Sequence, residues 1–200
     1  MTMAMGRASP ANPNVLLAAL LCAAVAAASF LPSSSSAADA SFVSQTCRRT
    51  PHPRLCVSVL LQPTNRSSSA AAATTVGELA VAAMAAARKS TFHARFRATE
   101  LSNDERNGAP PTAAAGDLVR RCEKLYGDCL RAATEALSIV STASTTLYGR
   151  AADVAAIFHV FPDRCESVFA ERRIASPLEQ VNRDMQEKLA VASDIIRLLR

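Results

Sequence analysis

Residues 117–140 read DLVRRCEKLYGDCLRAATEALSIV, and this stretch decides the fold. Its apolar side chains recur every three or four residues: Leu118, Cys122, Leu125, Cys129, Ala132, Ala136 and Ile139. Because an α-helix turns with that period, the stretch predicts a helix with one face in a core. A second stripe of this kind consists of Leu178, Val181, Met185, Ala192, Ile196 and Leu199. No segment alternates as a long strand would, so the sequence predicts an all-α protein, an antiparallel helix bundle.

Start and stop signals delimit the helix that precedes this stretch. Thr75-Val76-Gly77-Glu78 predicts a capping box, in which hydroxyl and carboxylate satisfy free amides at a helix start. The alanine-rich sequence after it predicts a helix to about Phe96, with Phe92 and Phe96 on one face. Residues 103–116 contain Asn107-Gly108 and Pro110-Pro111 and predict a loop.

The second half of the chain carries further boundaries. Residues 141–149 are rich in Ser and Thr and predict a break, after which residues 150–158 resume a helix that ends at Pro162. Ser176-Pro177-Leu178-Glu179 predicts a capped start for the last helix, with proline at its first position.

An apolar block lies ahead of all these helices. Residues 15–31 are mostly Val, Leu and Ala and follow Arg7, while Ala38-Asp39-Ala40 offers the small residues that signal peptidase accepts. Seventeen residues reach only the lower end of the range for a membrane span. The sequence therefore predicts a signal peptide over 1–40, one domain over 41–200, secretion, and no membrane association after cleavage.

Charge and composition narrow the partners. The chain carries a formal net charge of +5, which favours acidic partners such as a pectin-bearing wall or an acidic protein surface. The basic residues are scattered along the sequence, with pairs such as Arg48-Arg49 and Arg120-Arg121 as the longest runs. Aromatic residues are few, so neither a phosphate-binding stripe nor a base-stacking platform is expected, and nucleic acid is not a predicted partner.

Five cysteines remain once Cys22 leaves with the signal peptide: Cys47, Cys56, Cys122, Cys129 and Cys165. Cys122 and Cys129 lie about 10 Å apart along one helix, too far for a disulfide. Cys47 and Cys56 flank a proline-broken segment that can fold back into a hairpin, which makes them natural partners. Cys165 then pairs with Cys122 or Cys129, and one thiol is left over.

Several short motifs follow one another along the chain. They are Thr46-Cys47, Thr50-Pro51, Cys56 and Leu60, then Cys122-Glu123-Lys124-Leu125-Tyr126 with Ala133 and Leu137, Cys165 with Phe169, Ser176-Pro177-Leu178, and Ile195-Ile196-Arg197-Leu198-Leu199. In this order and spacing they resemble the plant invertase and pectin methylesterase inhibitor family, over essentially all of the mature chain. The resemblance implies a helical hairpin followed by an antiparallel four-helix bundle.

The resemblance also implies the disulfide pairing, Cys47 with Cys56 and Cys122 with Cys165. Cys129 is then an additional thiol. Its place on the apolar stripe favours an inert core thiol over an intermolecular disulfide. Asn65-Arg66-Ser67 is an N-glycosylation sequon that the secretory route would expose.

No catalytic or metal-binding constellation stands out. His52, His93 and His159 lie far apart and lack a metal-like partner at three or four residues' distance, and the cysteines are expected to be oxidised. The sequence shows no nucleophile elbow and no phosphate-binding glycine loop. We therefore predict a protein that is not an enzyme, needs no cofactor and binds no metal.

The resemblance implies an inhibitor in the extracellular space of the plant cell wall, one that binds one enzyme reversibly and blocks its substrate cleft. Family inhibitors of wall invertase carry Pro-Lys-Phe in the loop after the third-cysteine helix, whereas this chain has Ser144-Thr145-Thr146-Leu147-Tyr148. The ending at 195–199 is closer to the invertase branch. Pectin methylesterase is thus the slightly favoured target, with acid invertase of wall or vacuole as the alternative.

The predicted contact surface lies at the break after the third-cysteine helix. Its candidate residues are Ser141, Ser144, Thr145, Tyr148 and Arg150, and the alternative is an ordinary solvated loop. Phe158-His159-Val160-Phe161 is untypical before Cys165. It suggests either ordinary core or a helical interaction module that no longer inhibits. A free-standing enzyme is the less favoured alternative.

Overall fold

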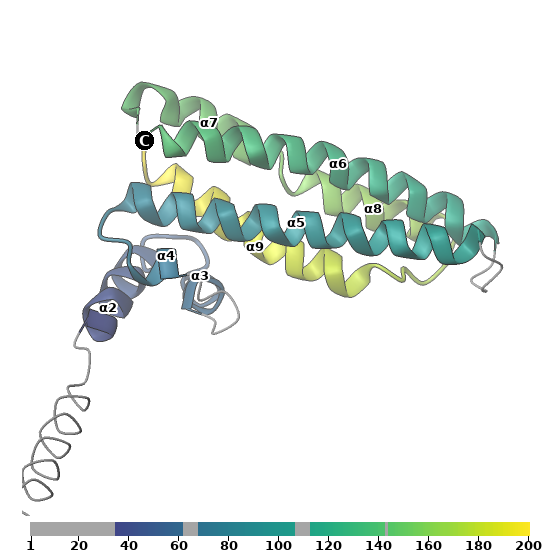
Figure 1. Ribbon diagram of the computed structural model, residues 1–200, viewed down its shortest axis with the longest axis horizontal. Coiled ribbons are helices and arrows are strands. Elements are labelled where there is room, and N and C mark those ends of the chain that lie inside the picture. Colours follow the sequence, from purple (N-terminus) through teal and green to yellow (C-terminus); the bar gives the residue numbers. More distant parts are fainter. Residues whose placement is uncertain (1–34, 62–67, 107–112, 143) are drawn as a thin grey trace, which may run out of the picture. The chain divides into compact units, whose positions relative to one another are not determined.

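The computed structural model describes residues 35–61, 68–106, 113–142 and 144–200. The chain divides into two units, Met1–Ser35 and Ser36–Arg200, and the described residues belong almost wholly to the second. Every regular element in the described ranges is helical (Figure 1), which confirms the all-α prediction. Most of the predicted signal peptide, including Cys22, lies outside the described residues, and so does the Asn65 sequon. The signal peptide and the glycosylation site therefore stay predictions.

A helical hairpin comes first in the described chain. It consists of α2 (Ser35–Cys47) and α3 (Pro53–Leu61), and the short α4 (Ser68–Ala71) follows it. A disulfide joins Cys47 to Cys56 with a Cα–Cα distance of 5.5 Å. The Thr50 hydroxyl donates a 2.7 Å hydrogen bond to the Cys47 carbonyl and closes the turn between the two helices. The α3 helix packs on α9, which docks the hairpin on the bundle.

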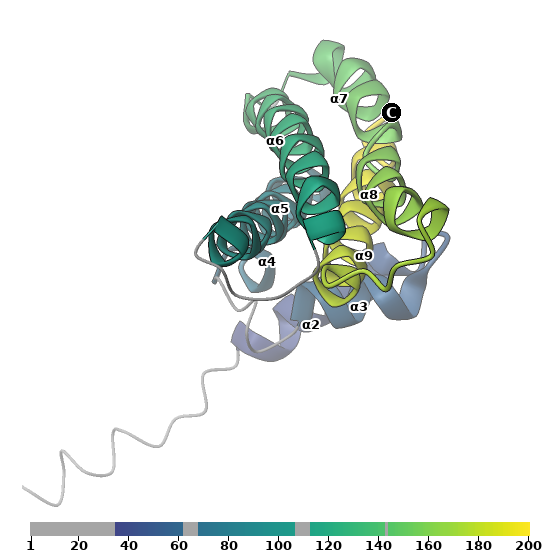
Figure 2. The same cartoon turned by 90° about the vertical axis from the view of Figure 1, so that its right-hand side faces the viewer.

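The remaining helices form an antiparallel four-helix bundle (Figures 1 and 2). They are α5 (Val76–Arg106), α6 (Ala113–Ser141), α7 (Tyr148–Ala156), α8 (Val160–Glu171) and α9 (Glu179–Arg197). The α5 helix packs on α6 and α9, while α7 and α8 each pack on α6 and α9 as well. The two shorter helices therefore share the third position of the bundle. The predicted hairpin and bundle are both confirmed.

The core is built from the predicted stripes of α6 and α9 and from small residues of α5. Ala80, Ala83, Ala87, Ala94 and Ala98 of α5 are almost completely buried. Side chains of this size let neighbouring helices approach closely, and α5 makes its most extensive packing with α6. The largest fully buried side chains are Tyr126, Phe158 and Phe169.

The predicted capping box is present at the start of α5. The Glu78 carboxylate accepts hydrogen bonds from the backbone amides of Thr74 (2.7 Å) and Thr75 (3.1 Å), and the Glu78 amide donates to the Thr75 hydroxyl at 3.2 Å. These hydrogen bonds, first of all those from Thr74, lower the pKa of Glu78 below its usual value.

The predicted loop over 103–116 is too long, because both flanking helices extend into it. The α5 helix ends at Arg106 rather than near Phe96, and α6 already begins at Ala113. Ala98 and Ser102 are fully buried, and the Ser102 hydroxyl donates to the Ala98 carbonyl at 2.9 Å. Packing of these small side chains, with the partly buried Leu101 beside them, continues the helix beyond Phe96.

Two helix boundaries were also predicted wrongly. Pro162 does not end a helix but is buried in the first turn of α8, where no amide hydrogen bond within the helix is needed. The last helix begins at Glu179, with Leu178 as its N-cap, and not directly after Ser176. The Ser176 hydroxyl instead accepts a hydrogen bond from the Leu178 amide (3.2 Å) and donates one to Glu166 (3.0 Å).

Candidate partner-binding surface

The second disulfide provides a rigid frame for any surface on the bundle. It joins Cys122 of α6 to Cys165 of α8, with a Cα–Cα distance of 4.9 Å and a sequence separation of 43. Spacing alone left Cys122 and Cys129 open as partners of Cys165, and the structure contains the pair that the family resemblance implied. Closing a loop of this length stabilises the fold by about 4 kcal/mol in the chain-entropy model.

Cys129 is the free cysteine of the described chain. Its side chain is fully buried, with the Thr91 hydroxyl 3.9 Å from its sulfur. Burial raises the pKa of the Cys129 thiol to about 12. A buried, neutral thiol is a poor nucleophile, so this geometry favours the inert core thiol over a bridge to a second chain.

A buried polar network ties α6, α8 and α9 together beside the second disulfide. The Tyr126 hydroxyl donates a 2.7 Å hydrogen bond to the Asn182 side-chain oxygen and lies 3.0 Å from the Cys165 sulfur. The Asn182 side-chain amide in turn donates to Glu166. Burial raises the pKa of Tyr126 well above its ordinary value. Tyr126 therefore holds the bundle together rather than facing a partner.

The predicted contact residues lie around the short 3₁₀ helix η3 (Thr145–Leu147) that separates α6 from α7. Ser141, Thr145 and Arg150 are exposed, and Ser144 is half-buried. Tyr148 is only 9 % exposed, which leaves little of its side chain for a partner. Its hydroxyl lies close to Gly77, at the start of α5.

Much of the polarity at this break is satisfied within the chain. The Ser141 hydroxyl donates to the Leu137 carbonyl at 2.7 Å, and the hydroxyls of Ser144 and Thr146 lie 2.9 Å apart. Arg150 forms an ion pair with Glu135 across the ends of α7 and α6. The break is thus a braced corner of the bundle that exposes hydroxyl groups.

A pair of exposed aromatic side chains on α5 was not assigned a role from the sequence. Phe92 and Phe96 lie one helical turn apart and are 60 % and 53 % exposed. The sequence held a sign of this exposure. Ala87, Ala94 and Ala98 mark the buried face of the helix, and Phe92 and Phe96 lie outside that face. Exposed aromatic side chains are enriched in protein–protein interfaces, which makes this pair a second candidate for partner contact.

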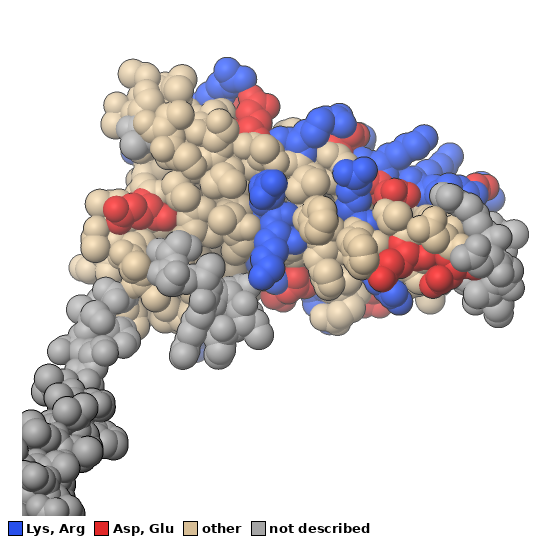
Figure 3. Space-filling view, viewed as in Figure 1, with Lys and Arg blue, Asp and Glu red and all other residues tan. Residues whose placement is uncertain are grey.

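Basic residues that are scattered along the sequence come together on the surface of the folded protein. In Figure 3, Lys and Arg cluster over α6 in the half of the bundle that lies away from α7. Arg121 and Lys124 of α6 meet Arg172, which follows the end of α8, around one hollow. Residues 51 positions apart in sequence therefore contribute to a single positive surface.

Two of the three histidines line one hollow. His52 Nδ1 lies 3.4 Å from Asp194 Oδ2 at the rim of a hollow of about 310 Å³ that His159 and Ser193 also line. No hydrogen bond joins the Ser193 hydroxyl to His52. His93 lies exposed on α5.

Within the described ranges, no group of three or more His, Cys, Asp or Glu side chains is placed to hold a metal ion. None of the described helices combines the length and the apolar character needed to cross a bilayer.

The fold defines a class of protein, a helical hairpin followed by a four-helix bundle, each part closed by its own disulfide. A sequence model of the family described as plant invertase/pectin methylesterase inhibitor matches residues 41–197, and the chain belongs to this family. Members of the family are inhibitors rather than enzymes, and they are typically extracellular. Comparison with curated proteins found no match.

Proposed function

We propose that this protein is a secreted inhibitor that binds pectin methylesterase one to one and reversibly covers its substrate cleft. The observation that carries the proposal is the match of the inhibitor family to residues 41–197, which spans the hairpin from Ser41 onward and the bundle. The proposed location is the extracellular space of the plant cell wall. The protein itself performs no catalysis and needs no cofactor.

The architecture suits an inhibitor that acts by occupying space. Two disulfides and a buried polar network hold the helices in one arrangement, so little conformational freedom is left to lose when a partner binds. A rigid surface that covers a substrate cleft prevents turnover without any bond being made or broken.

One feature supports pectin methylesterase over acid invertase, and the feature that favours acid invertase is weak. The corner between α6 and α7 carries Ser144-Thr145-Thr146-Leu147-Tyr148 in place of the Pro-Lys-Phe tripeptide of wall-invertase inhibitors. Its one aromatic side chain, Tyr148, is turned inward. The invertase-like ending is a weaker argument than its sequence suggests. Ile195 and Ile196 are fully buried, and core packing accounts for them without a target enzyme.

The proposed contact surface has two candidate parts. The first is the corner predicted from the sequence, where Ser141, Ser144, Thr145 and Arg150 remain available and Tyr148 contributes by bracing it. The second is the exposed pair Phe92 and Phe96 on α5. We favour the aromatic pair as the energetic anchor, because large apolar side chains dominate the free energy of binding at most interfaces.

Paired inhibition assays test the proposal. The protein, produced under oxidising conditions with both disulfides formed, is titrated against purified pectin methylesterase and purified acid invertase near wall pH. Loss of pectin demethylation alone supports the proposal, and loss of sucrose hydrolysis alone supports the invertase alternative. If neither activity falls, the inhibitor proposal gives way to a non-inhibitory interaction module. Turnover of pectin or sucrose by the protein alone would reveal an enzyme instead.

Substitutions separate the two candidate surfaces. We expect Phe92→Ala with Phe96→Ala to weaken inhibition by about tenfold or more, since each lost anchor contributes over about 1 kcal/mol. We expect a smaller loss from Ser144→Ala, Thr145→Ala and Arg150→Ala combined. Ile157→Ala is a matched control, because Ile157 is 49 % exposed and belongs to neither surface. A greater loss in the corner variant would assign the anchor to the corner.

The segment that suggested a non-inhibitory module has a simpler explanation. Phe158 is 1 % exposed, and Phe161 is half-buried against the core. Both side chains fill space at the junction of α7 and α8, as ordinary core residues do. The segment therefore supplies no separate reason to doubt inhibition.

A further inference from the structure

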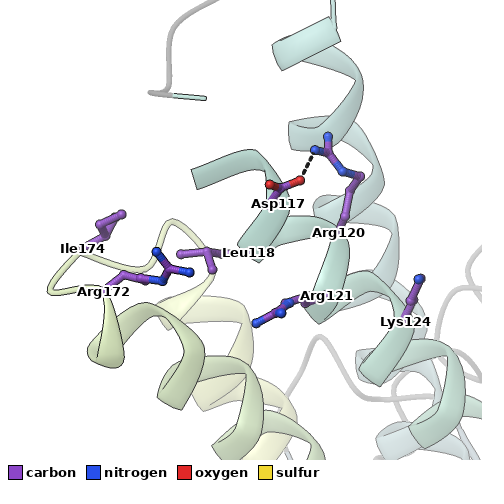
Figure 4. Close-up of a pocket in the computed structure, with 7 residues that line it drawn as sticks. All are labelled: Asp117, Leu118, Arg120, Arg121, Lys124, Arg172 and Ile174. Carbon is purple, nitrogen blue, oxygen red and sulfur yellow. Dashed lines mark hydrogen bonds and ion pairs between the residues drawn. The ribbon is translucent and has the colours of Figure 1, made fainter. Parts of the chain in front are cut away.

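A hollow of about 580 Å³ opens between the first turns of α6 and the end of α8 (Figure 4). The described residues around it are Asp117, Leu118, Arg120, Arg121, Lys124, Arg172 and Ile174. Figure 4 shows that Arg121 and Arg172 point from the two helices toward the space between them. Leu118 is buried, and the exposed residues around the hollow, Asp117, Arg121, Lys124 and Arg172, are all charged.

The charges of this hollow are poorly balanced. Asp117 is its one described carboxylate, and that group forms an ion pair with Arg120 at 2.5 Å. None of the acidic side chains in the described ranges forms an ion pair with Arg121, Lys124 or Arg172. Three cationic groups from two helices are thus left to bind an anion from outside. The hollow has the composition of a site for a ligand with several negative charges.

The hollow continues along the groove between α6 and α8. A second hollow of about 350 Å³ shares Arg121 and Lys124 with the first and adds Arg164. Asp128 and Glu171 also line it, so the positive charge is concentrated at the first hollow. From Leu118 to Asp128 the groove runs about 15 Å along α6. A track of this length suits an extended polymer rather than a single small anion.

The end of α8 is built so that Arg172 reaches the hollow. The Arg173 amide donates to the Ala170 carbonyl (3.0 Å), and the Ile174 amide donates to the Phe169 carbonyl (3.1 Å). This pattern is a Schellman motif, which requires a left-handed residue, and Arg173 has a φ of 56° where glycine is usual. The turn directs the chain across the end of the bundle with Arg172 and Ile174 on the hollow's rim.

The chemistry of the lining fits a carboxylated polysaccharide. Guanidinium groups bind carboxylates through paired hydrogen bonds. The described lining has no aromatic side chain, so it offers no stacking platform for nucleic acid, and its apolar residues are the buried Leu118 and the half-buried Ile174. Removal of methyl esters from pectin leaves a polymer of uronic acid residues, which carries carboxylates at regular intervals.

We propose that Arg121, Lys124 and Arg172 form a binding site for polyuronate, the de-esterified form of pectin. The inference rests on the proposed extracellular location, which places the protein beside that polymer. Such a site holds the inhibitor where demethylation has already begun. It is separate from the surface proposed for the enzyme, so binding to polymer and inhibition can be measured independently.

Binding of the full secreted protein to polygalacturonate, with no enzyme present, tests the site. We expect saturable binding that weakens as salt is added, and at least about tenfold weaker binding to fully methyl-esterified pectin. The variant Arg121→Gln, Lys124→Gln, Arg172→Gln should bind polygalacturonate about tenfold more weakly, since three exposed charge contacts are lost. Its thermal midpoint and disulfides are checked first, and the three single variants replace it if it folds poorly.

A second triple variant controls for net charge. This control variant carries Arg48→Gln, Arg49→Gln and Arg54→Gln and loses the same charge from the α2–α3 hairpin. It should bind polygalacturonate as the unmodified protein does. Equal weakening by both triples, or equal binding to methyl-esterified pectin, would overturn the site. The site would also be overturned if the variant with all three substitutions at Arg121, Lys124 and Arg172 bound polygalacturonate normally but inhibited the enzyme poorly, because the hollow would then contact the enzyme.

The same assays keep this inference distinct from the proposed function. A protein that binds polygalacturonate through the groove but inhibits neither enzyme contradicts the proposed function and supports the site. A protein that inhibits pectin methylesterase but does not bind polygalacturonate contradicts the site and supports the proposed function.

Discussion

The hairpin and the bundle are held together in different ways. The bundle buries continuous stripes from several long helices, including Leu118, Tyr126 and Met185. The hairpin buries few large side chains, chiefly Val43, Val59 and Leu60, and α2 has no clear apolar stripe. Its disulfide spans 9 residues, whereas that of the bundle spans 43. The difference indicates that the bundle owes its fold to packing and the hairpin to its disulfide and to docking on α9.

Removal of each disulfide in turn should separate the hairpin from the bundle most clearly. We expect Cys122→Ala with Cys165→Ala to lower the free energy of unfolding by about 4 kcal/mol. The loss for Cys47→Ala with Cys56→Ala should be about 2.5 kcal/mol, because the loop that Cys47 and Cys56 close is shorter. Urea unfolding measures both. Hydrogen exchange should show that loss of the short bridge exposes amides of the hairpin alone. Equal loosening of α5 and α6 would contradict the distinction.

Tyr126→Phe probes the polar network inside the bundle. The substitution leaves the buried Asn182 oxygen without its donor, and we expect the free energy of unfolding to fall by about 1–2 kcal/mol. Tyr148→Phe is the matched control. The Tyr148 hydroxyl has no hydrogen bond within the described residues, so a change below about 0.5 kcal/mol is expected. Similar losses in both variants would remove the special role of the network.

The buried Cys129 thiol should make the stability of the bundle depend on pH. Its pKa is raised from an ordinary value near 9 to about 12 in the folded bundle. Because the unfolded chain ionises first, the stabilisation is fully present below about pH 9 and is lost as pH rises toward 12. At pH 10 we expect a loss on the order of 1 kcal/mol. Cys129→Ala removes this contribution, so an identical pH slope in the variant would contradict the assignment.

The smallest expected effect concerns the docking of the hairpin. Asp194 of α9 is 8 % exposed in its side chain and pairs with His52 of the hairpin, whose side chain is 62 % exposed. We expect Asp194→Asn to cost about 0.5–1 kcal/mol and to increase hydrogen exchange in α3 more than in α6. Asp153→Asn, which breaks the exposed pair with Arg200, should change little. Uniform exchange across the bundle would argue against a docking role.

The parts that sequence predicted well are those with large residues at regular spacing. The stripes of α6 and α9 were visible because Leu118, Ile139 and Met185 recur with the helical period. The length of α5 was not recognised, because its fully buried side chains near the end are the small Ala98 and Ser102, and the one large apolar residue there, Leu101, is only partly buried. Pro162 was misjudged because its effect depends on its place in the helix, and sequence alone did not give that place.

The candidate surfaces were only partly predictable for a related reason. The break near Ser144 was marked by its composition, but the burial of Tyr148 depends on the start of α5, about 70 residues earlier. The basic hollow depends on α6 and α8 lying side by side, which scattered arginines do not reveal. The register of Phe92 against the alanine stripe was present in the sequence and identifies an exposed aromatic once the buried face is known.

The kinetic mode of inhibition shows whether the protein covers the substrate cleft of pectin methylesterase. Initial rates of pectin methylesterase are measured over a range of pectin concentrations at several concentrations of the disulfide-bonded protein. An inhibitor that covers the substrate cleft raises the apparent KM, leaves kcat unchanged, and reaches full effect at one inhibitor per enzyme. A fall in kcat at saturating pectin, or no inhibition at equimolar protein, would contradict the account.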